Sequence, residues 1–347
     1  VIQVGSGKGL GLISLRTIFY YLSTSLLAIL TGQILVNIFQ PGKNANIGLD
    51  REPEVIGAVD QGFGDLLLNI IPENPFQAMA EGDVLPVIFF SLLFGFFVTQ
   101  LKEQHRDVMG NFFRAAFEAM MKLVSFVIWT APIGVFGIIA EIVARTGFGA
   151  FASLGKYFLV VLAALSIHFF VTLPLLLKYI GKFHPVKHYR GMLPALMTAF
   201  TTCSTIVTLP LTMKAVTETS GASKKAAGFV LPIGATINMD GTALYECVAT
   251  IFIAQVYGFD LSMAQQGIIV LTAVLASIGA ASVPMSGMVM MSIILKAVGL
   301  PLEGVAIILA VDRILDMFRT TVNVFSDSVG AVIISRLEGD PVGADAP

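Results

Sequence analysis

Five polar side chains near the C-terminus recur at helical spacing within an apolar stretch. Asp312, Asp316, Arg319, Asn323 and Asp327 are separated by four, three, four and four residues, so an α-helix places all of them on one face. An arginine binds a carboxylate with its planar fork, and an aspartate can bind an ammonium group. We therefore expect Arg319 and Asp316 to bind an amino acid with an extra carboxylate. The alternative is an internal Asp316–Arg319 ion pair buried between helices.

A second set of side chains offers hard oxygen ligands. Its members are Asp312, Asn323, Asp327, Asn238, Asp240 and the hydroxyls of Thr24 and Ser25. Because no cluster of histidine and cysteine accompanies them, a soft-metal centre is not expected, and Na⁺ is the natural cation. The hydroxyls near Thr24 have a second interpretation, since they can also form hydrogen bonds between helices.

Glu246 follows Thr242 by four residues in an apolar context. A carboxylate that is desolvated inside a membrane can carry a proton. We therefore consider proton coupling at Glu246. The alternative is a structural carboxylate that faces a pore or forms a salt bridge.

The composition is that of an integral membrane protein. The chain has 347 residues, of which 56% are hydrophobic and 13% charged, whereas soluble domains have about 25% charged residues. We expect a multi-pass protein in contact with the lipid bilayer of the plasma (cell inner) membrane. The net charge of −2 and the lack of a basic run give no indication of a nucleic-acid partner. Cys203 and Cys247 provide neither a disulfide framework nor a CxxC site.

Several stretches are long enough and apolar enough to cross a bilayer. They are residues 17–42, 84–101, 112–140 (interrupted at 131–134) and 157–177. The segment 43–83 is acidic, and basic residues gather at 102–106, 178–190 and 214–225. By the positive-inside rule, the basic connections are cytoplasmic and the acidic loop is external. His184 and His188 are predicted to lie in a solvated loop, because Pro185 disfavours a helix there.

The C-terminal half contains interrupted elements. Residues 198–210 and 277–287 are rich in small residues, and 229–242 is predicted to be a helix broken around Pro232 and Gly234. Non-helical backbone at membrane depth is tolerated only where protein buries it or where it lines a cavity. Such interruptions point to the binding site of a transporter. We therefore expect a plainer scaffold followed by a substrate-carrying domain.

Three motifs carry a resemblance to a known family. They are NMDGTALYE (Asn238–Glu246), ASIGAASVP (Ala276–Pro284) and DMFRTTVNVFSDSVG (Asp316–Gly330). The chain resembles the sodium-coupled glutamate/aspartate transporter family over essentially its whole length. That family includes the excitatory amino acid transporters and the prokaryotic dicarboxylate/amino acid:cation symporters. Compared with a complete member, we expect the first span and most of the second to be missing.

The resemblance implies a fold, an assembly and a function. The fold is an all-α membrane protein with two re-entrant helical hairpins and broken helices, assembled as a homotrimer. The function is alternating-access symport of L-aspartate or L-glutamate with Na⁺, and with H⁺ as a further candidate. No enzymatic activity is implied.

The resemblance also implies a division of the chain into domains. Residues 1–130 are mainly scaffold and trimerisation spans with the external loop at 43–83, and the 84–140 region is shared between the parts. Residues 131–336 are mainly a transport domain. It contains hairpin 1 at about 192–212, a broken helix at about 226–256, hairpin 2 at about 264–296 and the charged helix 305–336. Residues 337–347 are a disordered tail.

Individual site residues follow from the matching motifs. The substrate set comprises Arg319 for the side-chain carboxylate, Asp316 for the ammonium, and Thr242, Asn323, Thr320, Ser204 and Thr205. One sodium site matches Tyr21, Thr24, Ser25, Asn238 and Asp240, and a second matches Gly234, Asn238, Asn323 and Asp327. A third matches Thr236, Ser277, Ile278 and Ala280, largely through carbonyl groups, and Glu246 matches the proton carrier.

The sequence departs from the family pattern at both hairpins. The first reads Cys203-Ser-Thr-Ile-Val207 where a serine run is usual, and the second has Ser282 and Met285 where glycines are common. These departures bear on substrate fit and on gate mobility.

Other functions fit the sequence less well than symport. A dicarboxylate would not require Asp316, and relatives selective for neutral amino acids replace the arginine at position 319. The GxGD sequence at 62–65 and the PAL sequence at 194–196 fit motifs of intramembrane aspartyl proteases. The Tyr-Asp pair that would supply the second catalytic aspartate is absent from the sequence. No charge-ring pattern indicates a pure ion channel.

Overall fold

The described part of the chain is helical. The computed structural model describes residues 11–43, 71–81, 84–128, 150–279, 286–340 and 342, with 133, 136, 137, 140 and 144 between them. Every regular element in these ranges is a helix, which confirms the all-α prediction. Several predictions lie outside the described residues: most of the acidic loop, the GxGD sequence, the interruption at 131–134 except 133, Ala280, Ser282, Met285 and most of the tail.

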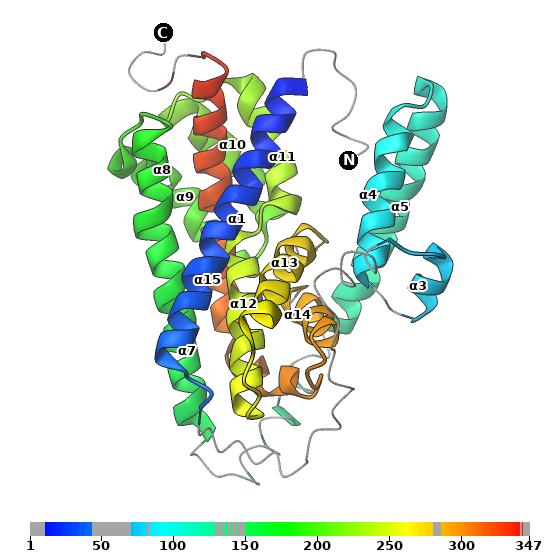
Figure 1. Cartoon of the computed structure of the whole chain (residues 1–347). Coiled ribbons are helices and arrows are strands. Elements are labelled where there is room, and N and C mark those ends of the chain that lie inside the picture. The colour runs from blue at the N-terminus through cyan, green and yellow to red at the C-terminus, as the bar shows by residue number, and fades with distance from the viewer. Residues whose placement is uncertain are drawn as a thin grey trace.

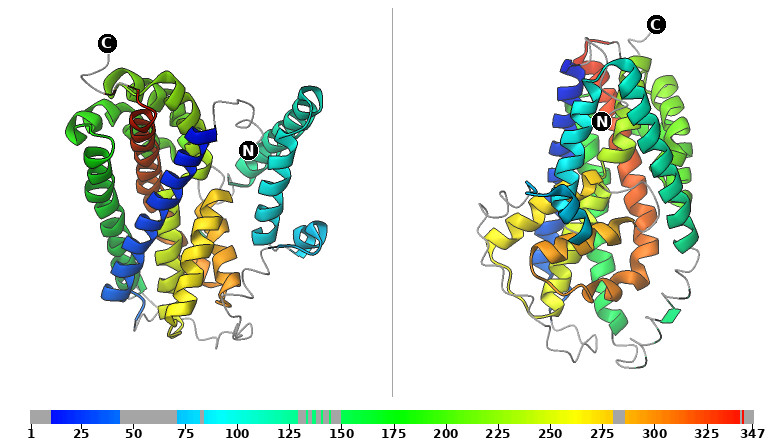
Figure 2. Two further views of the ribbon diagram at one scale, coloured as in Figure 1. Left: turned by 45° about the horizontal axis from the view of Figure 1, so that its top comes forward. Right: turned by 90° about the vertical axis from the view of Figure 1, so that its right-hand side faces the viewer.

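A bundle around one buried helix forms the main body. Helix α12 (Asp240–Val256) is buried from Asp240 to Ala254. It packs against α1 (Gly11–Phe39), α7 (Ala150–Ile167) and α15 (Gly304–Leu337). Figures 1 and 2 show α4 (Val84–Thr99) and α5 (Glu103–Ile128) as a pair of helices beside this bundle, with α3 (Pro75–Glu81) next to them. Helix α4 contacts the bundle through α13.

Two of the predicted spans are continuous and apolar enough to cross a bilayer. The stretches Leu12–Phe39 and Leu154–Tyr179 meet this test by length and composition. The second is built from α7, the π-helical turn η2 (His168–Thr172) and α8 (Leu173–Tyr179). The helix predicted to begin at residue 112 begins earlier, since α5 starts at Glu103.

Two helical pairs enter the bundle from opposite ends (Figure 1). Helices α9 (Pro185–Thr202) and α10 (Thr205–Thr219) meet at Cys203 and Ser204. Cys203 ends α9 in the left-handed conformation with φ 52° and ψ 36°. The Ser204 side chain then caps α10 by accepting a hydrogen bond from the Val207 N–H. Helices α13 (Met263–Gly279) and α14 (Ser286–Ala297) form the other pair.

The broken helix is interrupted later than predicted. Helix α11 (Lys224–Ile237) continues through Pro232 and Gly234. The backbone leaves the helical region at Asn238, with φ −96° and ψ 85°, and α12 starts at Asp240. The break is stabilised at this point because the Asn238 side chain bonds to α15, as described below.

The segment around the two histidines is also different from the prediction. Helix α9 begins at Pro185, and His188 is buried on it rather than solvated in a loop. A proline is favourable at the first helical position, where its missing N–H has no intrahelical partner. His188 contacts the hydroxyls of Ser220 and Ser328 at 2.7 and 2.9 Å, and so ties α9 to α15.

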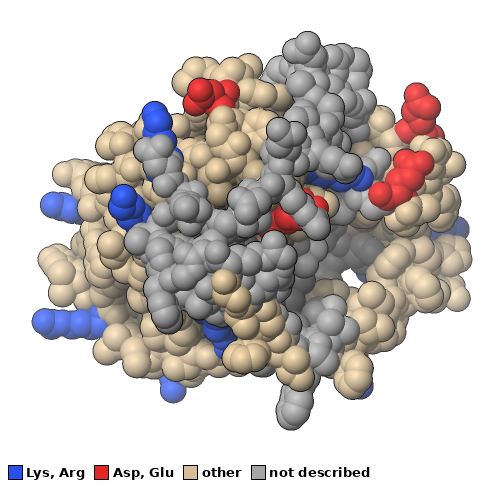
Figure 3. All heavy atoms as spheres, turned by 90° about the horizontal axis from the view of Figure 1, so that it is seen from below, with Lys and Arg blue, Asp and Glu red and all other residues tan. Residues whose placement is uncertain are grey.

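Many of the basic residues lie in the connections between helices. The three basic connections lie at one end of the molecule, together with the start of α1 and the end of α15 (Figure 1). Figure 3 views the opposite end, where much of the described surface is uncharged and the charged side chains lie mainly near the rim. The common location of the basic connections agrees with the positive-inside pattern.

Candidate functional site

The break between α11 and α12 places Asn238 and Asp240 in the middle of the bundle. Gly234, one turn before the break, lies against α15 and α1. A Cβ atom at position 234 would come 2.3 Å from Asp327 Oδ1 and 2.8 Å from the Tyr21 hydroxyl. Only a glycine therefore allows these oxygens to approach the backbone of α11 so closely.

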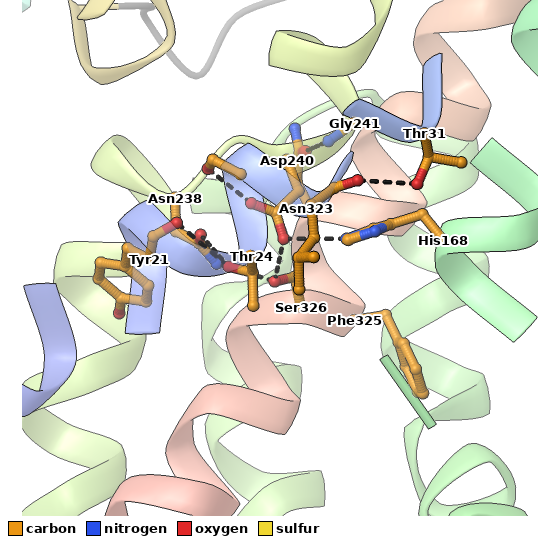
Figure 4. A network of polar contacts seen from close by, with 12 residues as sticks. Tyr21, Thr24, Thr31, His168, Asn238, Asp240, Gly241, Asn323, Phe325 and Ser326 are labelled. Carbon is orange, nitrogen blue, oxygen red and sulfur yellow. Dashed lines mark hydrogen bonds and ion pairs between the residues drawn. The ribbon is translucent and has the colours of Figure 1, made fainter. Parts of the chain in front are cut away.

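A polar network surrounds the break (Figure 4). Asp240 accepts hydrogen bonds from Ser25 Oγ at its Oδ1 atom and from Ser326 Oγ at its Oδ2 atom, both at 2.6 Å. His168 Nε2 lies 3.2 Å from the same Oδ2 atom. The carboxylate of Asp240 is thus held by groups from α1, η2 and α15. We call this network, with Asn238, Asp327 and Thr24, the oxygen cluster.

Asn238 connects the remaining members of the oxygen cluster. Its Nδ2 donates to Asp327 Oδ1 at 2.9 Å and to Ser326 Oγ at 3.1 Å. Its Oδ1 accepts from the Thr24 hydroxyl at 3.4 Å. The Tyr21 hydroxyl lies nearby but donates to the Val230 carbonyl. Five of the residues expected at sodium sites are therefore close together: Thr24, Ser25, Asn238, Asp240 and Asp327.

The residues predicted for the third sodium site are not all brought together by the described structure. Thr236 is exposed, and its hydroxyl donates to Ile233 of its own helix. Ser277 and Ile278 line a small cavity of about 40 Å³ with Ser25 and Ile237. These residues surround a common space between α1, α11 and α13.

A second cluster is centred on Arg319 and is built mainly from α15. Arg319 is buried, and its Nη2 lies 3.1 Å from Asp312 Oδ1 and 2.9 Å from Asp316 Oδ1. The guanidinium carbon lies 3.8 Å from the centre of the Tyr245 ring, a cation–π contact. Asp312 therefore belongs to this guanidinium cluster, whereas the sequence pattern groups it with the hard oxygen ligands.

The described residues leave two nitrogens of the Arg319 guanidinium, Nε and Nη1, without a hydrogen-bond partner. A Cβ atom at Gly287 of α14 would come 2.7 Å from Nη1. This side of Arg319 thus faces the second helical pair and has the capacity to bind an anion.

The predicted neutral substrate ligands lie in three different positions. Asn323 accepts from the Gly241 N–H at 2.8 Å and donates to the Thr242 hydroxyl at 3.2 Å. Thr320 is buried beside Arg319 on α15. At the tip of the first pair, Thr205 donates to the Ala235 carbonyl at 2.7 Å. The Thr205 hydroxyl therefore links this tip to α11.

Glu246 lies on α12 and is completely buried. Both of its carboxylate oxygens are without a hydrogen-bond partner in the part of the chain that the structure describes. Arg319 is close enough to act on it electrostatically. An unpaired carboxylate is costly to bury in its charged form, so the environment of Glu246 suits a group that takes up a proton.

Sequence reasoning missed two members of the oxygen cluster. Ser326 directly precedes Asp327, and its hydroxyl contacts both Asn238 and Asp240. His168 is completely buried. The sequence already singled it out, because apart from Tyr157 it is the sole titratable residue in the apolar stretch 157–177.

Comparison with known proteins gives a consistent result. Residues 1–337 match the sequence model described as "Sodium:dicarboxylate symporter family". The chain is similar to excitatory amino acid transporter 3 of Mus musculus, with 37% identity over 94% of this chain and 72% of that protein. It is also similar to the proton/sodium-glutamate symport protein of Geobacillus stearothermophilus, with 36% identity over 98% of this chain and 82% of that protein. An excitatory amino acid transporter of Caenorhabditis elegans is 39% identical over 91% of this chain and 72% of that protein.

Proposed function

We propose, from the premise that this chain belongs to the sodium:dicarboxylate symporter family, that it takes up an acidic amino acid together with Na⁺. The family consists of membrane transporters and not enzymes, so the chain is an integral membrane protein. The proteins similar to this chain include excitatory amino acid transporters and a proton/sodium-glutamate symport protein. L-Aspartate and L-glutamate are accordingly the proposed substrates.

The main support for this proposal is the arrangement of the guanidinium cluster. Arg319 is buried with two carboxylates, yet donors on Nε and Nη1 have no partner among the described residues. A substrate carboxylate can bind these donors, while Asp316 binds the ammonium group. Thr242, Thr320 and Asn323 supply neutral contacts nearby, and the first helical pair contributes Ser204 and Thr205 at its tip. A dicarboxylate would bring no cation to Asp316 and is not favoured.

The oxygen cluster supports the coupling to Na⁺. Its carboxylates and hydroxyls are hard ligands of the kind that Na⁺ accepts. We assign one ion to Tyr21, Thr24, Ser25, Asn238 and Asp240. A second is assigned to Gly234, Asn238, Asn323 and Asp327, and a third to Thr236, Ser277, Ile278 and Ala280. Glu246 is assigned as the site of a co-transported proton.

The architecture proposed for transport follows from the same premise. The pairs α9–α10 and α13–α14 act as re-entrant hairpins that gate the site from opposite sides. Residues up to about 130 form mainly the scaffold, and 131–336 mainly the moving transport domain, with 84–140 shared between them. The protein assembles as a homotrimer in the plasma membrane, with its basic connections in the cytoplasm. Cross-linking in native membranes that yields only monomers would exclude the trimer.

Uptake by proteoliposomes tests the function. The full-length protein is reconstituted, and accumulation of labelled L-aspartate is measured with an inward Na⁺ gradient, with an equal K⁺ gradient and with no gradient. The expected result is concentrative uptake in the Na⁺ gradient alone. Equal uptake under all three conditions would exclude sodium-coupled symport.

A further inference from the structure

The hydroxyl of Ser326 lies between the two polar residues of the helix break (Figure 4). It donates to Asp240 Oδ2 at 2.6 Å and accepts from Asn238 Nδ2 at 3.1 Å, and the side chain is completely buried. The same Asn238 Nδ2 donates to Asp327 Oδ1 at 2.9 Å. Ser326 therefore belongs to a continuous chain of polar contacts between two carboxylates, although it is not among the residues proposed for the ions.

The contacts of this hydroxyl leave it able to bind a cation. A hydroxyl has one proton to donate and two lone pairs that can accept. Asp240 receives the proton of Ser326, and Asn238 occupies one lone pair. Among the described residues, no other donor contacts this oxygen. The second lone pair belongs to an oxygen 2.6 Å from a buried carboxylate, to which a cation is attracted.

The hydroxyl also approaches from a side that the other hydroxyls do not supply. Thr24 and Ser25 both belong to α1, and Ser25 donates to Asp240 Oδ1. Ser326 belongs to α15 and contacts the other oxygen of the same carboxylate, Oδ2. Hard cations take about six oxygen ligands that are spread around the ion. An ion at Asp240 therefore benefits from a ligand on the α15 side.

Packing against α1 fixes the position of Ser326. Its backbone carbonyl accepts a hydrogen bond from the Tyr20 hydroxyl at 3.0 Å. One turn later on α15, a Cβ atom at Gly330 would come 2.6 Å from the ring of Tyr20. The two helices thus approach closely on both sides of this contact. A side chain on a backbone held in this way is positioned before a ligand arrives.

We propose that Ser326 is a further ligand of the Na⁺ ion assigned to Asp240 and that it supplies the oxygen from α15. The assignment rests on the proposed function and adds one residue to the ion site. Its hydroxyl is neutral, so it contributes less than the Asp240 carboxylate. Its characteristic effect is on the affinity for the ion, because Ser326 has no contact with the guanidinium cluster among the described residues.

Two substitutions separate the oxygen ligand from the space that it fills. Ser326→Ala removes the oxygen, and Ser326→Cys keeps a similar shape but replaces the hard oxygen by a soft sulfur. The matched control is Ser328→Ala, at an equally buried serine of α15. The Ser328 hydroxyl contacts His188 and the Phe325 carbonyl rather than the oxygen cluster.

Two quantities are measured with the full chain in nanodiscs. The first is the Na⁺ concentration that gives half-maximal binding of labelled L-aspartate, and the second is the dissociation constant of L-aspartate in saturating Na⁺. Both Ser326 variants should raise the first by about 5-fold and leave the second unchanged. Ser328→Ala should change neither quantity.

Other outcomes overturn the assignment. An unchanged Na⁺ requirement in Ser326→Ala would exclude the hydroxyl as a ligand. A rise in Ser326→Ala with wild-type behaviour in Ser326→Cys would identify a loss of packing instead, and so would an equal rise in both measured quantities. If Ser326→Ala does not fold, the Na⁺ requirement of Ser326→Cys decides by the same criterion. If the wild-type protein binds no L-aspartate in Na⁺, the proposed function itself fails, and this assignment fails with it.

Discussion

The two polar clusters of α15 differ in how their charges are balanced. In the guanidinium cluster, Asp312 and Asp316 both contact Arg319, so opposite charges are present before any ligand arrives. In the oxygen cluster, Asp240 and Asp327 contact hydroxyls, an amide and the His168 imidazole. No lysine or arginine in the described ranges forms an ion pair with either aspartate.

This difference in charge balance supports the different ligands that we propose for the two clusters. Buried charges are tolerated when a counter-ion neutralises them. The guanidinium cluster has a cation whose Nε and Nη1 donors have no partner among the described residues, and it is suited to an anionic group. The oxygen cluster has anionic ligands and is suited to a cation. Removal of one partner at a time therefore affects the amino acid and the ion differently.

The largest effect is expected from removal of the buried guanidinium. Arg319→Cys eliminates a charge-assisted contact and should weaken L-aspartate binding by at least about 10-fold. It should also shift the preference towards a neutral amino acid such as L-serine. Arg319→Lys should bind L-aspartate poorly as well, since an ammonium lacks the planar fork. Competition with labelled L-aspartate measures both.

The matched control is Arg190→Cys, at an exposed arginine outside both clusters. It should bind L-aspartate like the wild type. Near wild-type affinity in Arg319→Cys would require the carboxylate to bind elsewhere, for example around Ser204 and Thr205 at the tip of the first helical pair.

The next largest effect is expected from variants of the oxygen cluster. These variants should weaken the binding of Na⁺ rather than that of the amino acid. Asp240→Ala and Asp327→Ala each remove a negative oxygen ligand and should raise the half-saturating Na⁺ concentration by about 10-fold. Sodium titrations of L-aspartate binding provide the measurement. Asp260→Ala, at an exposed aspartate, is the control. Unchanged titrations in both cluster variants would remove the sodium assignment.

A smaller effect is expected from crowding the oxygen cluster without removing a ligand. The Cβ of Gly234→Ala would come 2.3 Å from Asp327 Oδ1, so the carboxylate or α11 must move, at a cost of about 1–3 kcal/mol. Thermal unfolding with and without Na⁺ should show lower stability and a weaker response to the ion. Gly228→Ala on the same helix has open space for its Cβ and should be neutral. Equal behaviour of the two variants would contradict the close contact.

The smallest effect on affinity is expected at Glu246. Glu246→Gln keeps the shape of the side chain but cannot release a proton. L-Aspartate exchange should therefore persist, while net uptake becomes less sensitive to a proton gradient. Glu218→Gln, at an exposed glutamate of α10, is the control. A pH profile of uptake identical to that of the wild type would assign Glu246 a structural role.

The sequence predicted which residues belong to the site better than it predicted how these residues divide into two clusters. Helical spacing correctly placed Asp312 and Asp327 on one face of α15, but it did not show that they belong to different clusters. They are 15 residues apart, or about 22 Å along a helix, and their neighbours on α12 and α1 decide their roles. Those neighbours depend on tertiary packing, which residue spacing within one helix does not report.

The position of the break illustrates the same limit. Proline and glycine favoured an interruption around Pro232 and Gly234, whereas the chain departs from helical geometry at Asn238. The hydrogen bonds from Asn238 to Ser326 and Asp327 come from a helix almost 90 residues away, and they outweigh local propensity. The contact between His168 and Asp240 likewise depends on tertiary packing and not on local sequence.

Asn323 occupies the boundary between the two clusters and therefore relates their occupancies. Its oxygen accepts from the Gly241 backbone beside Asp240, and its amide nitrogen donates to Thr242 beside the guanidinium cluster. A shift of this single side chain changes both environments together. If the ion and the amino acid bind at the sites proposed, such an arrangement gives a coupling free energy between them, and thermodynamic linkage makes that coupling reciprocal. The factor by which Na⁺ increases the affinity for the amino acid must then equal the factor by which the amino acid increases the affinity for Na⁺.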